Sequence, residues 1–225
     1  MQSVKQTYSV KAIIFDMDGV ITNTMPDHYE SWRIVLKDYG IDVTYLDIYQ
    51  REGQKGLQSV KEISKFYGKE IPPDKAQRLL DEKEALFKKI VQVRFVDGSR
   101  AMIQNLHQRG FSLALVTGTS RHEVERILPV ELRDLFHVIV TANEVKRGKP
   151  HPEPYLSALS QLKIESMAGI VVENAPLGIQ SAKEAGLRCL ALATSLPKEY
   201  LLQADGIFEN IEQMLTSVEF NLRSS

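Results

Sequence analysis

The sequence predicts an α/β fold, a Rossmann-like parallel sheet with an α-helical cap inserted after the first strand. Two observations support this prediction. Short apolar runs alternate with helical patterns over most of the chain, as they do in parallel sheets covered by helices on both faces. One long segment near the N-terminus breaks the alternation, because it has helical patterns and no convincing buried strand.

The first expected strand is 12–15, an Ala-Ile-Ile-Phe run that ends abruptly at Asp16. A short continuous apolar run is typical of a strand buried on both faces. Further strands of this kind are expected at 112–116, 138–140, 169–172 and 189–192. Helical patterns lie between them, at 98–109, 121–128, 153–162 and 176–185.

The segment that breaks the alternation runs from about Pro26 to Val91, and prolines mark its boundaries. Within it we expect helices at 27–39, 57–67 and 74–90, and we interpret the charges of 81–89 as a solvated helix face. We therefore predict two domains, with hinges near 22–26 and 93–98. Residues 1–23 and 96–225 would form the catalytic core, and residues 24–95 the cap.

Composition limits the function classes. The chain has 225 residues, of which 43% are hydrophobic, so it can bury a substantial core. Its 28 basic and 29 acidic side chains give a net charge of −1, which suggests neither a nucleic-acid partner nor a membrane-surface partner. Cys189 is the one cysteine, the first residues lack a signal-peptide pattern, and no apolar run could span a bilayer. We expect a cytoplasmic protein.

Acidic side chains follow the first expected strand. Asp16 and Asp18 lie two positions apart, with Gly19 next. Two carboxylates on one tight loop repel each other unless a proton or cation lies between them, and Mg²⁺ favours such oxygen ligands. One carboxylate could then attack phosphorus while the other handles a proton. The alternatives are a calcium loop and a solvated turn.

Polar residues also follow the other expected strands, at the edge where ligands bind in open α/β sheets. Thr117 and Gly118 could cradle a phosphate, although Thr119 or Ser120 could simply cap the next helix. Lys149, in a proline-bounded loop, could offset negative charge, or it could be an ordinary solvated lysine. The oxygens of Glu173 and Asn174 could complete a magnesium shell, or Asn174 could cap a helix.

Together these loops resemble the haloacid dehalogenase superfamily of phosphatases and phosphomutases. The inserted helices resemble the cap of its β-phosphoglucomutase-like subgroup, in which a histidine and a tryptophan are common at the positions of His28 and Trp32. The matching motifs occur in the family's order and span nearly the whole chain: 15–20, 116–118, 148–150, 172–178 and 182–186.

The resemblance implies a role for each matching residue. Asp16 would be the nucleophile that forms an aspartyl-phosphate, and Asp18 the general acid and base. Thr117, Gly118 and Lys149 would position the phosphate. Asp16, Asp18 through its backbone carbonyl, and the Glu173–Asn174 turn would bind Mg²⁺. The expected partner is a small phosphorylated substrate, and His28, Glu52 and Lys55 of the expected cap would lie beside it.

The chain departs from the family pattern at Asn174, where an acidic residue is common. The loss of one negative charge should weaken magnesium binding unless another carboxylate compensates. The candidate is Glu52 in the expected cap. Alternatively, Glu52 could be an ordinary solvated residue of a turn. Glu-Asn followed by Ala-Pro-Leu-Gly, with a Glu-Gly cap loop, resembles the inorganic-pyrophosphatase branch of the family.

Three functions stay open at this point. The leading prediction is a hydrolase of phosphate monoesters or pyrophosphate. The second is a β-phosphoglucomutase-type mutase, which the resemblance disfavours because Gly56 stands where such mutases have an arginine, and Lys55 is only a point-charge substitute. The third is a catalytically weak phosphate-binding protein. A chain of this size with a closing cap could act alone, and we expect a monomer.

Overall fold

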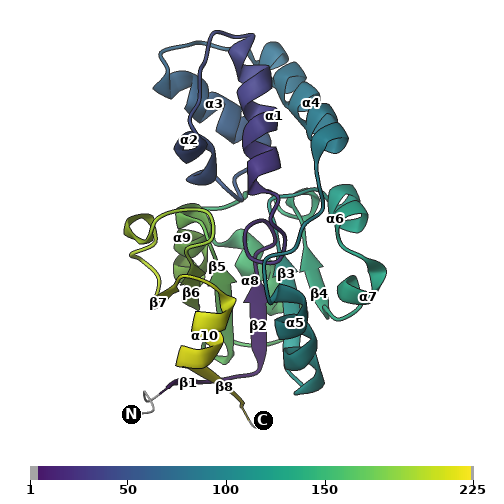
Figure 1. Cartoon of the computed structure of the whole chain (residues 1–225), viewed down its shortest axis with the longest axis vertical. Helices are drawn as coiled ribbons and strands as arrows, with labels where there is room; N and C mark the ends of the chain where they lie inside the picture. Colours follow the sequence, from purple (N-terminus) through teal and green to yellow (C-terminus); the bar gives the residue numbers. More distant parts are fainter. Residues whose placement is uncertain (1–4, 224–225) are drawn as a thin grey trace.

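The computed structural model describes residues 5–223, which form two tiers (Figure 1). The lower tier contains a parallel sheet with helices on both faces, and the upper tier contains four helices. The sheet has six strands in the order β4-β3-β2-β5-β6-β7. Its strands are β2 (Ala12–Phe15), β3 (Ser112–Val116), β4 (Val138–Val140), β5 (Gly169–Glu173), β6 (Arg188–Leu192) and β7 (Gly206–Phe208).

Alternate residues of the sheet pack into two separate hydrophobic cores. Ile13 and Phe15 of β2 face one core, together with residues of α5 (Ser99–Gln108), α6 (Arg121–Ile127) and α10 (Ile211–Ser217). Ile14 faces the other core, with residues of α8 (Glu153–Leu162) and α9 (Pro176–Glu184). Because both faces are covered, the strands are continuous apolar runs, as the sequence pattern predicted.

The upper tier consists of α1 (Met25–Lys37), α2 (Tyr45–Tyr49), α3 (Gly56–Phe66) and α4 (Pro73–Ile90), above the sheet in Figure 1. These helices share their own apolar cluster, which includes Trp32, Leu36 and Ile63. Phe87 near the end of α4 belongs instead to a core of the lower tier. The division into a core and a cap at residues 24–95 stays a prediction.

Two neighbouring chain segments join the tiers. Thr22 forms an antiparallel bridge with Phe95, and the backbone N–H of Asn23 donates to the carbonyl of Arg94 at 2.8 Å. The first segment leads into α1 and the second leads out of α4. Both therefore cross between the tiers at one place.

The predicted strands and long helices are confirmed to within about two residues at each end. Helix α1 begins at Met25 rather than at 27, because Pro26 fits in the first turn, where its missing N–H is not needed. The two-stranded parallel sheet of β1 (Gln6–Val10) and β8 (Val218–Leu222) was not predicted from the sequence. Also not predicted were β7, α2, α7 (Val130–Arg133), α10 and the 3₁₀ turns Ala142–Glu144, Ser166–Ala168 and Lys198–Tyr200.

None of the helices within residues 5–223 combines the length and the apolar character needed to cross a membrane.

Candidate active site

Asp16, Lys149 and Glu173 form a buried charged cluster at the carboxyl ends of the central strands. Asp16 follows β2 and Glu173 ends β5, which pairs with β2 in parallel register. Lys149 Nζ donates to Asp16 Oδ1 and to Glu173 Oε1, each at 2.6 Å, and to the carbonyl of Val116 at 3.2 Å. All three side chains are at most 2% exposed. Lys149 is therefore a fixed charge inside the site and not a solvated surface lysine.

The Glu173 carboxylate has partners on both oxygens. Oε1 accepts from Lys149 and from the Tyr155 hydroxyl at 3.1 Å, while Oε2 accepts from the backbone N–H groups of Asn174 and Ala175 at 2.7 and 3.0 Å. A Cβ atom on Gly178 would lie 1.6 Å from Oε1, so only glycine leaves room for this carboxylate. Glu173 is thus built in as a support for Lys149, with no oxygen free for a metal.

Two other buried oxygens are free. Asp16 Oδ2 and Asn174 Oδ1 find no hydrogen-bond partner among residues 5–223. Leaving such atoms unpaired in the interior costs free energy, and a hard cation such as Mg²⁺ would satisfy both. Residues 5–223 contain no group of three or more His, Cys, Asp or Glu side chains placed to bind a metal. The donor set that fits Mg²⁺ is one carboxylate, one amide and a backbone carbonyl.

Burial raises the pKa of Asp16 to about 8 in spite of the opposing charge of Lys149, and the carboxylates of Glu173 and Asp18 add to the rise. If Asp16 is the nucleophile that the family resemblance implies, it must be ionised to attack phosphorus. An opposite charge close by lowers a carboxyl pKa. A divalent cation at the free oxygens would therefore favour the reactive form of Asp16.

Asp18 has a different environment from Asp16. Its Oδ2 accepts from the Thr119 hydroxyl at 3.0 Å, and its Oδ1 accepts from the Thr24 hydroxyl and lies 3.5 Å from His28 Nε2. Burial alone would raise the pKa of Asp18, but His28 and the two threonine hydroxyls together hold that pKa below its ordinary value. Asp18 is thus an ionised hydrogen-bond acceptor that faces both the core loop and α1.

The loop after β3 contains Thr117 and Gly118. Thr117 is 4% exposed, and its hydroxyl accepts from the backbone N–H of Thr119 at 3.0 Å. Ser120 is the residue that caps α6, since its hydroxyl accepts from the N–H of Glu123. Capping by Ser120 leaves Thr117 and Gly118 at the bottom of the site, where a phosphate would bind.

The cap loop 51–56 lies directly on the core loops. A Cβ atom on Gly118 would lie 2.8 Å from the backbone of Gly53, and one on Gly53 would lie 2.4 Å from Lys149 Cδ. Lys55 Nζ donates to the carbonyl of Val145 at 2.6 Å. Lys55, expected at the substrate, here fastens the cap loop to the core instead.

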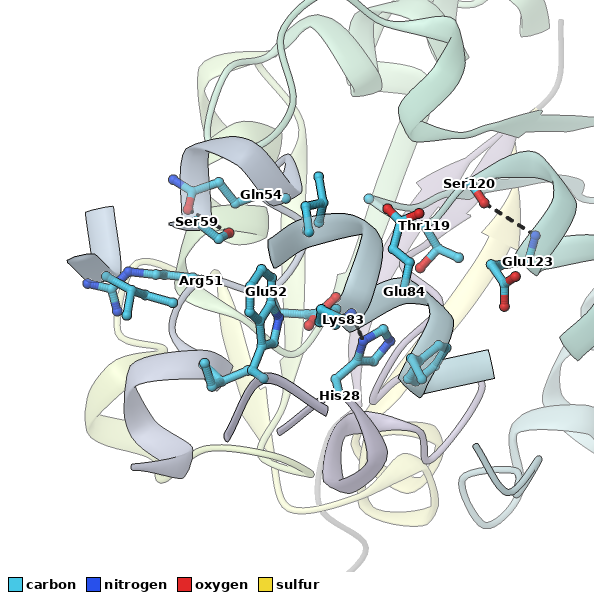
Figure 2. A pocket seen from close by; sticks show the side chains of 18 residues that line it. His28, Arg51, Glu52, Gln54, Ser59, Lys83, Glu84, Thr119, Ser120 and Glu123 are labelled. Carbon is cyan, nitrogen blue, oxygen red and sulfur yellow. Dashed lines mark hydrogen bonds between the residues drawn. The ribbon is translucent and has the colours of Figure 1, made fainter. Parts of the chain in front are cut away.

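A cavity of about 100 Å³ lies between the two tiers, beside Thr119 (Figure 2). It is lined from the cap by His28, Glu52 and Lys83, and from the core by Gly118 and Thr119. Burial raises the pKa of Glu52, as do the charges of Asp18 and Asp16, whereas Lys83 opposes the rise. Glu52 thus lines the cavity and is close enough to both aspartates for their charges to affect it.

Lys83 lies in a different environment from the one its sequence pattern predicts. The charge pattern predicts a solvated helix face, yet Lys83 is only 7% exposed, and its Nζ lies 3.0 Å from His28 Nδ1 (Figure 2). His28 in turn stacks on Phe87 with ring centroids 4.0 Å apart. Thr24, Thr119 and Tyr155 were also not anticipated. The only available signal for Lys83 was its spacing of four residues from the apolar Leu79 and Phe87.

Comparison with known proteins identifies the family. Residues 13–192 match the family model described as haloacid dehalogenase-like hydrolase. A phosphorylated carbohydrates phosphatase from Thermotoga maritima is 32% identical over 79% of this chain and 82% of its own length. A validoxylamine A 7'-phosphate phosphatase from Streptomyces hygroscopicus subsp. limoneus is 30% identical over 91% of this chain and 95% of its own length.

Solved structures agree on the fold. A β-phosphoglucomutase from Clostridium difficile superimposes with a TM-score of 0.80 at 24% identity, over 91% of this chain and 93% of the other. At that identity the likeness concerns the fold alone. With its family motifs at the carboxyl ends of β2, β3 and β5, the chain belongs to the haloacid dehalogenase-like hydrolases.

Proposed function

We propose that this chain is a magnesium-dependent phosphatase of small molecules that works through an aspartyl-phosphate on Asp16. The observation that supports it best is the pair of free buried oxygens, Asp16 Oδ2 and Asn174 Oδ1, beside Lys149 at 2.6 Å from Asp16. The two relatives that are 32% and 30% identical to this chain are phosphatases, which supports phosphate ester hydrolysis.

In the first half of the reaction, the Asp16 carboxylate attacks phosphorus and the bond to the leaving oxygen breaks. Asp18 supplies the proton that this oxygen takes. Its pKa is low in the free enzyme, but a bound phosphate dianion raises the pKa of a neighbouring carboxyl group. The charge of Lys149 and the backbone N–H of Gly118 would neutralise the phosphoryl oxygens. The N–H groups of Thr117 and Thr119 are already bonded to the Val140 carbonyl and the Thr117 hydroxyl.

In the second half, ionised Asp18 accepts a proton from a water molecule, which attacks phosphorus and releases inorganic phosphate and free Asp16. The low pKa of Asp18 suits it to this role. Mg²⁺, held by Asp16, Asn174 and the Asp18 carbonyl, would supply positive charge against the phosphoryl oxygens. Glu173 would act through Lys149 and not as a ligand, because both of its oxygens are occupied.

Phosphate release from a panel of phosphate monoesters and pyrophosphate, with and without Mg²⁺, tests the proposal. We expect release only with Mg²⁺, and a phosphorylated Asp16 detectable by mass spectrometry after rapid acid quenching. Absence of turnover across the panel with Mg²⁺ present, with ligand binding retained, would instead favour a phosphate-binding protein.

Pyrophosphate is the first substrate to try, and Glu52 is the observation that favours it. Glu52 lines a cavity of only about 100 Å³, which suits a compact leaving group, and burial and the charges of Asp18 and Asp16 raise its pKa. It could also restore the negative charge that Asn174 lacks. Glu52→Ala should weaken magnesium binding, so that activity needs more Mg²⁺, and should lower pyrophosphate turnover; if both are unchanged, Glu52 has no part in the site.

The mutase alternative needs a group that grips a second phosphate. Gly56 has no side chain for this purpose, and the amine of Lys55 is bonded to Val145. Product analysis with β-glucose 1-phosphate separates the two reactions. Free phosphate supports the hydrolase, and glucose 6-phosphate supports the mutase.

A further inference from the structure

The loop that follows β6 contacts the proposed metal site from outside. Asn174 Nδ2 donates to Ser195 Oγ at 3.0 Å, and the neighbouring Thr194 hydroxyl donates to the carbonyl of Gly19 at 2.5 Å. A Cβ atom on Gly19 would lie 2.1 Å from Asn174 Nδ2 and 2.7 Å from Ser195 Oγ. The amide nitrogen and the hydroxyl thus meet in space that is open only because residue 19 is glycine.

An asparagine ligand has an orientation problem that an aspartate lacks. Its amide presents one oxygen and one NH₂ group, and only the oxygen can bind a cation. Asn174 is fully buried, with Oδ1 free among residues 5–223 and Nδ2 against Ser195. Rotation of the amide by half a turn would instead aim NH₂ at the cation.

We propose that Ser195 is a positioning residue that selects the orientation of Asn174 in which Oδ1 faces the metal. This rests on the proposed function. A hydroxyl that accepts from Nδ2 stabilises that orientation and draws electron density toward Oδ1, which strengthens a neutral ligand. The serine thereby makes an amide usable where the family commonly has a carboxylate.

If Ser195 selects the orientation of an amide, it should not help magnesium binding when residue 174 is a carboxylate. A carboxylate offers an oxygen in either orientation, so nothing needs to be selected. Ser195 could then only donate to it, which withdraws charge from the ligand. Dependence of magnesium binding on Ser195 should therefore vanish in the Asn174→Asp chain.

Isothermal titration of the resting chain with Mg²⁺, without substrate, measures this directly. Ser195→Val is the informative change, because Ser195 lines a surface groove and water could replace the hydroxyl in an alanine variant. We expect about fivefold to tenfold weaker Mg²⁺ binding, the effect of one lost hydrogen bond. The same change in the Asn174→Asp chain should alter binding by less than about twofold, since no orientation is lost.

Two controls separate positioning from general damage to the loop. Ser195→Thr keeps the hydroxyl and should keep wild-type Mg²⁺ affinity. Lys198→Ala removes an exposed ion pair with Glu209 in the same loop and should have no effect. Circular dichroism and thermal melting check that each variant folds, and Ser195→Ala serves if Ser195→Val does not.

Unchanged affinity in the Ser195→Val chain would overturn the proposal. An equal loss in the wild-type and Asn174→Asp backgrounds would also overturn it, because that outcome means a purely structural role. If the wild-type chain binds no Mg²⁺, the proposed function itself fails, and this result differs from a failure at Ser195 alone.

Discussion

The core half and the cap half of the candidate site are built differently. In the core, Asp16, Lys149 and Glu173 are at most 2% exposed and are joined by hydrogen bonds of 2.6 Å at the ends of neighbouring strands. In the cap, Glu52 and Lys55 are partly exposed and belong to the loop 51–56, which packs against Gly118 and Gly148 of the core. The core side chains are thus held in a buried network, whereas the two cap side chains are partly open to solvent. The following changes test this contrast.

The largest effect is expected at the nucleophile. Asp16→Asn should lower phosphate release by at least about a thousandfold, because the amide cannot form the acyl phosphate. Steady-state assays with Mg²⁺ measure the loss, with exposed Asp134→Asn as the matched control. Turnover within about tenfold of wild type would place the nucleophile elsewhere.

One added methyl group should lower the free energy of unfolding more in the core half than in the cap half. Gly178→Ala puts a Cβ atom 1.6 Å from Glu173 Oε1, so we expect about 1–3 kcal/mol of destabilisation from overpacking. Gly68 in the cap has a φ of +65°, and a Cβ atom there would meet nothing within 4 Å, so Gly68→Ala should cost only about 1 kcal/mol of backbone strain. Urea unfolding compares the two variants. The contrast fails if Gly68→Ala is the more damaging change.

The contact between the two tiers should respond to one added methyl group. Gly118→Ala pushes against the Gly53 backbone, and we expect kcat/KM to fall by on the order of tenfold to a hundredfold. Gly148→Ala meets chiefly the flexible Lys55 side chain, at 3.0 Å, and should have a smaller effect. Equal kcat/KM for both variants would show that the Gly53 contact is not needed for closure.

The smallest effect concerns a helix cap in the upper tier. Asp47 accepts from the backbone N–H and hydroxyl of Thr44 and from the Tyr67 hydroxyl, and although burial opposes it, these bonds hold its pKa below the ordinary value. A lowered pKa stabilises the fold above the unfolded value of about 3.9, and the stabilisation is lost as pH falls through the folded value.

Asp47→Asn should therefore cost about 1 kcal/mol at pH 7 and progressively less below about pH 4. Urea unfolding across this pH range measures the difference between the two chains. A difference that stays constant down to about pH 2 would mean that the charge of Asp47 is not involved.

The sequence was sufficient for the parts of the fold with local signals. Strand β2 and the Asp16 loop were predictable because an apolar run and two carboxylates are adjacent in the chain. Strands β1 and β8 were not, since they pair from opposite ends of the chain and neither has a strong apolar pattern of its own. The roles predicted for the site residues, the monomeric state and the cytoplasmic location stay predictions.

In the site, too, only the residues that belong to local sequence motifs were predictable. Motif spacing led to Asp16, Asp18 and Lys149. It did not lead to Thr24, which bonds Asp18, or to Tyr155 and Ser195, which bond Glu173 and Asn174, because these are single hydroxyls outside the motifs. Lys83 was misjudged because a charged residue in a charged helix gives no sign of burial. Only the packing of α4 against α1 places its amine beside His28.

The linker that enters α1 has a mechanical consequence. Thr24 lies in this linker and its hydroxyl donates to Asp18, while Thr22 bridges to the returning segment at Phe95. Under the proposed function, a rotation of the upper tier about this pivot would separate Thr24 and His28 from Asp18. The Asp18 carboxyl would then lose partners that hold its pKa down, so its readiness to accept a proton would depend on the position of the upper tier.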